Sequence, residues 1–101
     1  MATATIKLVN GELLGNFYFT PDPVALAQKL LKGGLYQVLG TMAVDAEGEA
    51  AAEEVFDLTN NPSRQDEREQ VYGRGRSVSV GDIVCVDGQD FLCASVGWVA
   101  V

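Results

Sequence analysis

The side chains of this chain that could do chemistry are two cysteines, a group of carboxylates and a run of arginines, because histidine is absent. Without imidazole the chain lacks the commonest general base, the usual zinc ligand and every Ser-His or Cys-His nucleophile pair. Cys85 and Cys93 do not form a C-x-x-C arrangement and have no neighbours that would complete a zinc site. We therefore expect no catalytic residue, no metal and no cofactor, and a protein that is not an enzyme.

The two cysteines have a redox and a structural interpretation. A loop centred on Gln89 would place Cys85 opposite Cys93 on adjacent strands, close enough for a disulfide in principle, whereas a loop of another length would separate them. For a cytoplasmic chain we favour the structural interpretation, two small buried apolar residues.

Two further patterns resemble binding sites without meeting their requirements. "GRGRS" (residues 73–77) lacks the phosphate-loop spacing and precedes a strand-like segment, so we expect no nucleotide site there. Asp82, Asp87 and Asp90 lie near turns, and the EF-hand pattern is absent. Aspartates in such positions are expected to bond to their own backbone.

Charge is distributed unevenly along the chain. The formal charge of −7, from 14 acidic and 7 basic residues, disfavours nucleic acid or an anionic membrane as a direct partner. Between Lys32 and Arg64 there is no basic residue, and the acidic residues there are Asp45, Glu47, Glu49, Glu53, Glu54 and Asp57. The arginines that follow are Arg64, Arg68, Arg74 and Arg76. Two interpretations stay open: a solvated helix face followed by a mixed-charge loop, or an acidic surface that binds a basic partner.

The first elements that position these residues are a hairpin and a helix. "TIKLVNGELLGNFYF" alternates apolar and polar residues around Asn10-Gly11, which predicts an N-terminal hairpin. "TPDPVALAQKLLKGG" predicts a helix with Asp22 as N-cap, Pro23 at the first helical position and Gly33 as the left-handed stop.

The second half of the chain predicts a strand over residues 35–44, a second helix within residues 45–62 and a surface loop with at most a short helical turn over 63–76. A C-terminal hairpin follows, with residues 87–90 as its turn and a third short strand after Gly97. We expect one small α+β domain over residues 1–101, an antiparallel or mixed sheet with the two helices on one face. The sequence contains neither a secretory signal nor a membrane-spanning run, so we expect it in the cytoplasm.

One resemblance to known proteins rests on "EEVFDLTNN" (residues 53–61) and "GRSVSVGDIVCVDGQDFLCASVGW" (residues 75–98). These segments resemble short proteins encoded by phages, plasmids and conjugative elements, and the pattern is similar to that of the YodL-like domain. The likeness covers about residues 35–99 and is most specific at residues 58–60 and 76–82. Relatives often have tryptophan after Leu-Thr-Asn, where this chain offers only Tyr72. The resemblance implies a mobile-element setting and supplies no catalytic residue.

The residues of this pattern also have structural roles that can be predicted. Asn60 is expected to cap the second helix or to bond the next strand, and Asp82 to hold the Val-Gly-Asp turn. Arg76 is expected to pair with Asp57 or Asp82 and so to tie the second helix to the hairpin.

From these observations we expect a phage- or mobile-element-encoded accessory protein, in the host cytoplasm, that binds a protein of the host or of the element. Inhibition of a host enzyme or defence complex fits a short acidic chain without catalytic groups, with carboxylates that mimic phosphates. The residues expected to contact the partner are Glu49, Glu53, Glu54, Asp57, Tyr72, Arg74, Arg76 and Trp98, although core packing is favoured for Trp98. The alternative is a nucleic-acid-associated module that uses the basic loop from Arg64 to Arg76. Pairing of copies through an exposed strand edge also stays open.

Overall fold

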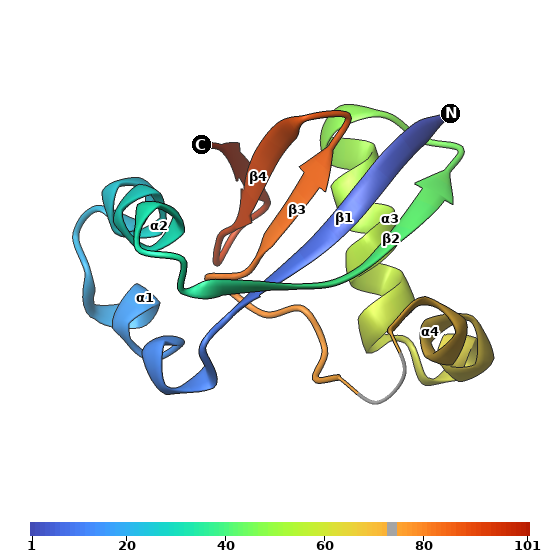
Figure 1. The fold of residues 1–101 in the computed structure, drawn as a ribbon, viewed down its shortest axis with the longest axis horizontal. Coiled ribbons are helices and arrows are strands. Elements are labelled where there is room, and N and C mark those ends of the chain that lie inside the picture. Colours follow the sequence, from blue (N-terminus) through green and yellow to red (C-terminus); the bar gives the residue numbers. More distant parts are fainter. Residues whose placement is uncertain (73–74) are drawn as a thin grey trace.

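Strand β1 (Ala2–Val9) is an inner strand of a five-stranded antiparallel sheet with the order β2-β1-β3-β4-β5. It pairs with β2 (Tyr36–Val44) on one side and with β3 (Ile83–Val86) on the other, so it joins distant segments of the sequence (Figure 1). The computed structural model describes residues 1–101 apart from Gly73, Arg74 and the side chain of Tyr72. The predicted fold class, a single small α+β domain, is confirmed.

The predicted N-terminal hairpin is wrong. After β1 the chain forms a 3-10 turn, η1 (Gly11–Leu13), and a short helix, α1 (Asn16–Phe19). Asn10 has φ −52° and its side-chain oxygen accepts a hydrogen bond from the Glu12 N–H, so it acts as the cap of the turn. A two-residue hairpin loop of the Asn-Gly kind needs positive φ at both residues, and neither Asn10 nor Gly11 has it. The same two residues therefore start a helical segment.

Helix α2 (Pro23–Lys32) begins as predicted, but its left-handed stop is Gly34 and not the predicted Gly33. Asp22 accepts a hydrogen bond from the Ala25 N–H, and Pro23 occupies the first turn. Gly33 is still right-handed, at φ −79°, and the left-handed residue is Gly34, at φ +71°. Backbone bonds from the N–H groups of Gly34 and Leu35 to the carbonyls of Leu31 and Leu30 close the helix as a Schellman motif.

The middle of the chain contains two helices after β2. Helix α3 (Gly48–Asn60) is confirmed, with Ala51, Val55 and Leu58 buried along one face. The segment predicted as a surface loop instead forms the 3-10 turn η2 (Pro62–Arg64) and helix α4 (Gln65–Tyr72). Helix α4 packs against β2 where the strand has no side chain, because a Cβ at Gly40 would lie 2.5 Å from the Val71 carbonyl oxygen. A polar sequence thus forms a helix that packs through few residues.

The C-terminal hairpin is confirmed, with a shorter turn than predicted. Strand β3 and strand β4 (Gln89–Cys93) are joined by Asp87-Gly88 alone, both at positive φ, and the third strand is β5 (Trp98–Ala100). This register places Cys85 opposite Asp90 and Cys93 opposite Trp98, so a loop centred on Gln89 is not formed. Both cysteines are free thiols.

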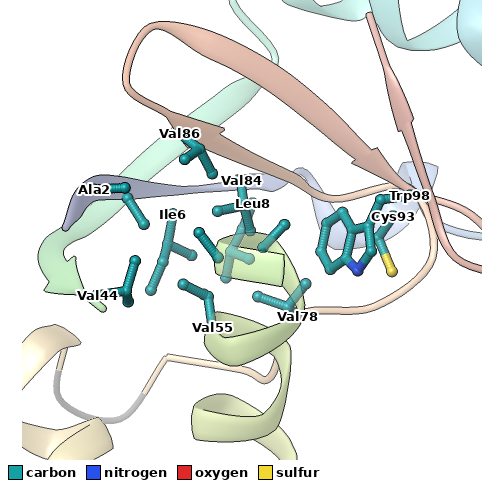
Figure 2. Packing of buried hydrophobic residues seen from close by; sticks show 13 residues of the cluster. Ala2, Ile6, Leu8, Val44, Val55, Val78, Val84, Val86, Cys93 and Trp98 are labelled. Atoms are coloured by element: carbon teal, nitrogen blue, oxygen red, sulfur yellow. The ribbon is translucent and has the colours of Figure 1, made fainter. Parts of the chain in front are cut away.

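Helices cover both faces of the sheet, which corrects the expectation that they share one. Every second residue of β1 and of β3 points to one face of the sheet. There these residues pack on Ala51, Ala52 and Val55 of α3 (Figure 2). The opposite face packs on α1 and α2, where Ile83 and Leu92 meet Phe17, Ala27 and Leu30. Helices α1 and α2 therefore lie at the other end of the molecule from α3 and α4 (Figure 1).

Candidate functional site

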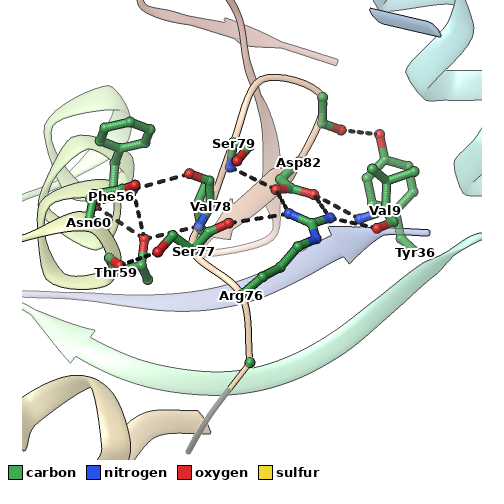
Figure 3. Close-up of polar contacts among 12 residues, drawn as sticks. Val9, Tyr36, Phe56, Thr59, Asn60, Arg76, Ser77, Val78, Ser79 and Asp82 are labelled. Atoms are coloured by element: carbon green, nitrogen blue, oxygen red, sulfur yellow. Dashed lines mark hydrogen bonds and ion pairs between the residues drawn. The ribbon is translucent and has the colours of Figure 1, made fainter. Parts of the chain in front are cut away.

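The most buried charged contact of the described residues joins Arg76 to Asp82 (Figure 3). The Asp82 side chain is 0% exposed, and Arg76 donates to it through Nη1 at 2.5 Å and Nη2 at 2.7 Å. The backbone of Val9 bonds to both side chains. Its N–H donates to Asp82 Oδ1 at 2.9 Å, and its carbonyl oxygen accepts from Arg76 Nη2 at 2.6 Å.

This ion pair takes the place of a backbone partner for β1. Strand β3 begins at Ile83, opposite Lys7, so Val9 lies beyond the last paired residue on that side. Gly81 has φ +101° and directs its N–H to the Cys93 carbonyl, and its own carbonyl accepts from the Tyr36 hydroxyl at 2.6 Å. The ion pair therefore satisfies the Val9 N–H and C=O that a continued β3 would have bonded.

The Tyr36 hydroxyl belongs to the same buried group. Burial raises the pKa of Tyr36 far above its ordinary value, and the negative charges of Asp82 and Asp90 raise the pKa further. The phenol is therefore a neutral hydrogen-bond donor at all physiological pH values, which suits its structural bond to Gly81.

A second set of side chains ties the end of α3 to the segment before β3. Thr59 Oγ1 accepts from the Val78 N–H at 3.1 Å, and Asn60 Nδ2 donates to the Val78 carbonyl at 3.1 Å. Ser77 Oγ donates to the Thr59 carbonyl at 2.6 Å. Asn60 thus bonds the segment that leads to β3, although Val78 itself is not in a strand, and it also donates to the Phe56 carbonyl of its own helix at 3.0 Å.

The predicted role of Asp82 in the turn is confirmed, and of the two partners predicted for Arg76 the structure shows Asp82. Asp82 Oδ2 accepts from the Ser79 N–H at 2.7 Å and so holds the turn before β3. Arg76 pairs with Asp82 and not with Asp57, so it ties the turn to β1 and not to the second helix. The most specific residues of the sequence pattern are thus used to join elements of the fold.

The other two aspartates near the C-terminal turn were expected to bond to their own backbone, but they bond to β1 instead. Asp87 Oδ1 accepts from the Thr3 N–H at 2.9 Å, and Asp90 Oδ1 pairs with Lys7 Nζ at 2.9 Å. Both contacts hold the turn of the hairpin against β1.

All of the net charge lies on one part of the molecule. Residues 45–71, which hold α3 and α4, contain nine acidic and two basic residues, and the rest of the chain contains five of each. This segment alone therefore accounts for the net charge of −7. We call its carboxylates the acidic surface: Asp45, Glu47, Glu49, Glu53, Glu54, Asp57, Asp66, Glu67 and Glu69.

Arg64 organises part of the acidic surface. Its guanidinium contacts Glu54 at 2.6 Å and Asp57 at 2.9 Å on α3, and Glu67 at 2.9 Å on α4. Hydrogen bonds that Arg64 donates to Glu67, Asp57 and Glu54 raise the pKa of Arg64, and the bond that Glu67 accepts from Arg64 lowers the pKa of Glu67. Three carboxylates are thus held together around one cation, so the cluster keeps a net negative charge.

Glu53 and Trp98 contact each other. The Trp98 Nε1–H donates to Glu53 Oε2 at 2.9 Å, and the indole ring packs edge-on against Phe56 with 6.4 Å between ring centroids. Only 8% of Trp98 is exposed, so the favoured core position of this residue is confirmed (Figure 2). Glu49, one turn before Glu53, is exposed on α3.

The expected partner-binding residues are therefore brought together only in part. The four carboxylates of α3 share one region of the surface, and Trp98 lies beneath Glu53. Arg76 points to β1 instead. Arg74 and the side chain of Tyr72 lie outside the described residues.

The described arginines of the expected basic loop contact other parts of the fold. Arg68 donates to the Thr59 and Gly75 carbonyls and to Ser77 Oγ. With Arg64 among carboxylates and Arg76 on Asp82, the described arginines join the elements of the fold. Sequence reasoning missed that Arg64 and Glu67 are partners, although their i, i+3 spacing was the available signal once this segment is known to be helical.

Two open hollows border these groups. One of about 390 Å³ lies between the end of β2 and the two acidic helices, with Asp45, Glu54 and Glu67 among its lining residues. The other, of about 520 Å³, lies beside Val9, Tyr36 and Arg76. Both are open to solvent, and the charged groups that line them are already paired in part.

The described part of the chain contains neither a metal-binding cluster nor a membrane-spanning helix. No three Cys, Asp or Glu side chains of the described residues lie where they could together hold a metal ion. Among the same residues, no helix has the length and apolar character needed to cross a bilayer.

Burial raises the pKa of the Cys93 thiol to about 11. Burial, and then the bond to Asp90, also raise the pKa of the Cys85 thiol, so neither thiol favours the reactive thiolate.

Comparison with known proteins finds no matching family model, no matching curated protein and no matching solved structure.

Proposed function

We propose that this protein acts by binding, through its acidic surface, the basic nucleic-acid-binding groove of another protein. The observation that carries the proposal is the confinement of the entire net charge to residues 45–71. Complementary charge increases the association rate and rejects like-charged partners, and a surface of one sign selects a partner of the opposite sign. The resemblance to phage, plasmid and conjugative-element proteins suggests the setting, an accessory protein that inhibits a host enzyme or defence complex.

The contacts of Arg64 support the phosphate-mimic part of the proposal. Glu54, Asp57 and Glu67 come from two helices and are held at 2.6–2.9 Å from a single guanidinium. Carboxylates that are already fixed in position lose less conformational entropy on binding than free side chains do. A cluster of fixed negative groups resembles the phosphates that a nucleic-acid-binding groove recognises.

The alternative, direct nucleic-acid binding by the basic loop, has less support. Arg64, Arg68 and Arg76 each make several contacts within the fold. Binding of phosphates by these arginines would break those contacts and would bring the backbone of a nucleic acid near the acidic surface.

The experiment compares two variants that change the net charge equally. Glu49→Lys with Asp66→Lys alters the acidic surface at exposed carboxylates away from the Arg64 cluster. The control, Glu12→Lys with Asn16→Lys and Gln28→Lys, alters exposed positions in the part of the molecule whose acidic and basic residues balance.

Each protein is immobilised, incubated with host lysate, and washed or challenged with a DNA or RNA oligonucleotide. The proposal predicts capture of nucleic-acid-binding proteins by the wild type and the control, release of these proteins by the oligonucleotide, and their loss in about 0.5 M NaCl. Equal capture by the Glu49→Lys/Asp66→Lys variant, or capture that is indifferent to salt and oligonucleotide, would contradict it. A gel shift of DNA by the purified protein alone would favour the alternative.

A further inference from the structure

The free edge of β5 carries two backbone groups that face outward. Val99 lies opposite Leu92 of β4. On either side of it, the Val101 N–H donates to the Asp90 carbonyl and the Gly97 carbonyl accepts from the Ala94 N–H, so residues 97, 99 and 101 are the ones directed toward β4. In an antiparallel ladder the residues between such bonded positions direct their N–H and C=O the other way. Trp98 and Ala100 therefore present both groups to the outside of the sheet.

This edge is open in the described structure. Strand β5 is the last strand in the sheet order and lies outside β4 at the C-terminal end of the chain (Figure 1). Across residues 1–72 and 75–101, no backbone hydrogen bond outside the β4–β5 ladder uses Trp98 or Ala100. The edge also lacks the usual protection against pairing, since residues 91–101 contain no charged residue and no proline.

The opposite edge of the sheet differs. Strand β2 has an irregular register opposite Ile6 and Lys7, and α4 packs on it at Gly40. A bulged strand twists away from a partner, which is a common way of protecting an edge. Of the two edges, β5 is therefore the better template for another strand.

We propose that two copies of this chain pair through β5 about a twofold axis at Val99. An antiparallel pair centred there joins Trp98 of each copy to Ala100 of the other, so each outward N–H meets a C=O. The two Val99 side chains then meet at the axis on the α2 face of the sheet, where Val99 is 37% exposed in the single chain. The five-stranded sheets become one continuous sheet, and the contact is isologous, the commonest form of self-association.

The self-complementary register about Val99 favours a second copy as the occupant of this edge, and the charges of the strand do not oppose it. Like charges directly opposite one another destabilise a strand pair, and the uncharged 91–101 segment places none across the axis. The two acidic surfaces repel at longer range, and one strand pair buries less area than a permanent dimer, so the association is weak and strengthens as salt screens the repulsion. The proposed binding of a basic partner weakens as salt rises, whereas this association strengthens. One proposal can therefore be refuted while the other stands.

The experiment is sedimentation of the purified chain from about 10 µM to 1 mM in low salt and in about 0.5 M NaCl. We expect a shift with concentration from 10.8 kDa toward twice that mass, more complete in high salt. Val99→Lys, which places two ammonium groups at the axis, should leave a monomer throughout. Val38→Lys makes the same change on the other edge strand, at a residue that is 58% exposed, and should behave as the wild type.

A second measurement does not depend on a variant folding. Hydrogen exchange of the wild type should show the Trp98 and Ala100 amides becoming slower by about tenfold or more as the protein concentration rises through the transition. A chain that stays monomeric at about 1 mM in high salt overturns the proposal. Dissociation by Val38→Lys, or a dimer in which these two amides exchange as in the monomer, also overturns it.

Discussion

Replacement of Arg76 by alanine tests whether the ion pair with Asp82 completes the sheet. The substitution removes both bonds to a carboxylate that is 0% exposed and also the donor to the Val9 carbonyl. Asp82 keeps its bonds from the Val9 and Ser79 N–H groups and loses its only described countercharge. The remaining charge is therefore buried and uncompensated.

The size of the effect follows from burial. Breaking a buried ion pair by removing one partner costs about 3–5 kcal/mol, and an unpaired buried carbonyl costs about 1–3 kcal/mol. The Arg76 side chain is 32% exposed, so water can enter the vacated space and partly solvate both groups. We therefore expect a loss of about 3 kcal/mol in the free energy of unfolding, a large part of the roughly 5–15 kcal/mol of a small domain.

The assay is urea unfolding followed by the fluorescence of Trp98, the only tryptophan of the chain, which is buried in the core. The matched control is Arg64→Ala, which also removes a guanidinium with several ion pairs. Its three carboxylate partners are 43–57% exposed, so the control should lose less than about 1 kcal/mol. An Arg76→Ala protein within about 1 kcal/mol of the wild type would refute the structural role, the more so if it had lost a binding activity.

A double-mutant cycle separates the pair from its surroundings. Arg76→Ala combined with Asp82→Ala removes the lone buried charge, so the double variant should lose less stability than the sum of the two single variants. Additive losses would show that the two side chains act separately, contrary to the geometry.

Three further predictions follow from the same structure. Gly81→Ala should lower the free energy of unfolding in urea by about 1–3 kcal/mol, because φ is +101° and a Cβ would lie 2.5 Å from the Phe17 ring. Iodoacetamide at about pH 8 should alkylate Cys93 about 100-fold more slowly than an ordinary thiol, because burial raises its pKa to about 11, and peptide mass spectrometry measures this rate. Arg64 lowers the pKa of Glu67 in the folded protein, so their pairing contributes stability at neutral pH that is lost as the pH falls through that lowered value. Glu67→Gln should therefore reduce the fall in Tm on acidification below about pH 4.5.

Each of the three has a control within the chain. Gly15→Ala adds a methyl group where nothing lies within 4 Å and should not destabilise the protein. Cys85 is less buried, although its pKa is raised as well, so it should react faster than Cys93, and the reverse order would contradict the prediction. Glu69→Gln changes a carboxylate of α4 outside the Arg64 cluster, and an equal effect on the acid transition would show that the pairing is unimportant.

The parts of the fold that local signals specify were predictable. Helix α2 has its N-cap and proline in the expected places, and α3 has a buried face at helical spacing. The Asp87-Gly88 turn requires two positive φ values, which this dipeptide adopts easily, so the hairpin was predictable although its turn was expected to extend to Asp90. In these segments the sequence and the tertiary contacts favour the same structure.

The N-terminal hairpin failed because Asn-Gly also suits another local structure. An asparagine side chain that accepts from the N–H two residues later starts a helical turn as readily as it forms a hairpin loop. Pairing of β1 with β2 and β3, which lie 27 or more residues away along the chain, selects the helical turn over the hairpin. The loop expected at residues 63–76 failed for a related reason, since α4 has little apolar periodicity and is held by Arg64 and by β2.

The candidate site was predictable in its residue types and not in its contacts. The acidic character of α3 is evident from composition, whereas the cross-link to Glu67 requires knowing that α4 packs beside α3. In the same way, two partners for Arg76 were open from the sequence, and only the fold shows that Asp82 is the partner, because both side chains bond to the Val9 backbone.

The inner position of β1 also bears on how the chain is made. Its residues are translated before either neighbouring strand, and β3 begins more than 70 residues after β1 ends. Until β3 is made, the nascent β1 has no native partner on that side, and the Val9 backbone has neither Arg76 nor Asp82 to bond. Completion of the sheet therefore depends on closing a long loop, which predicts slow folding for a domain of this size.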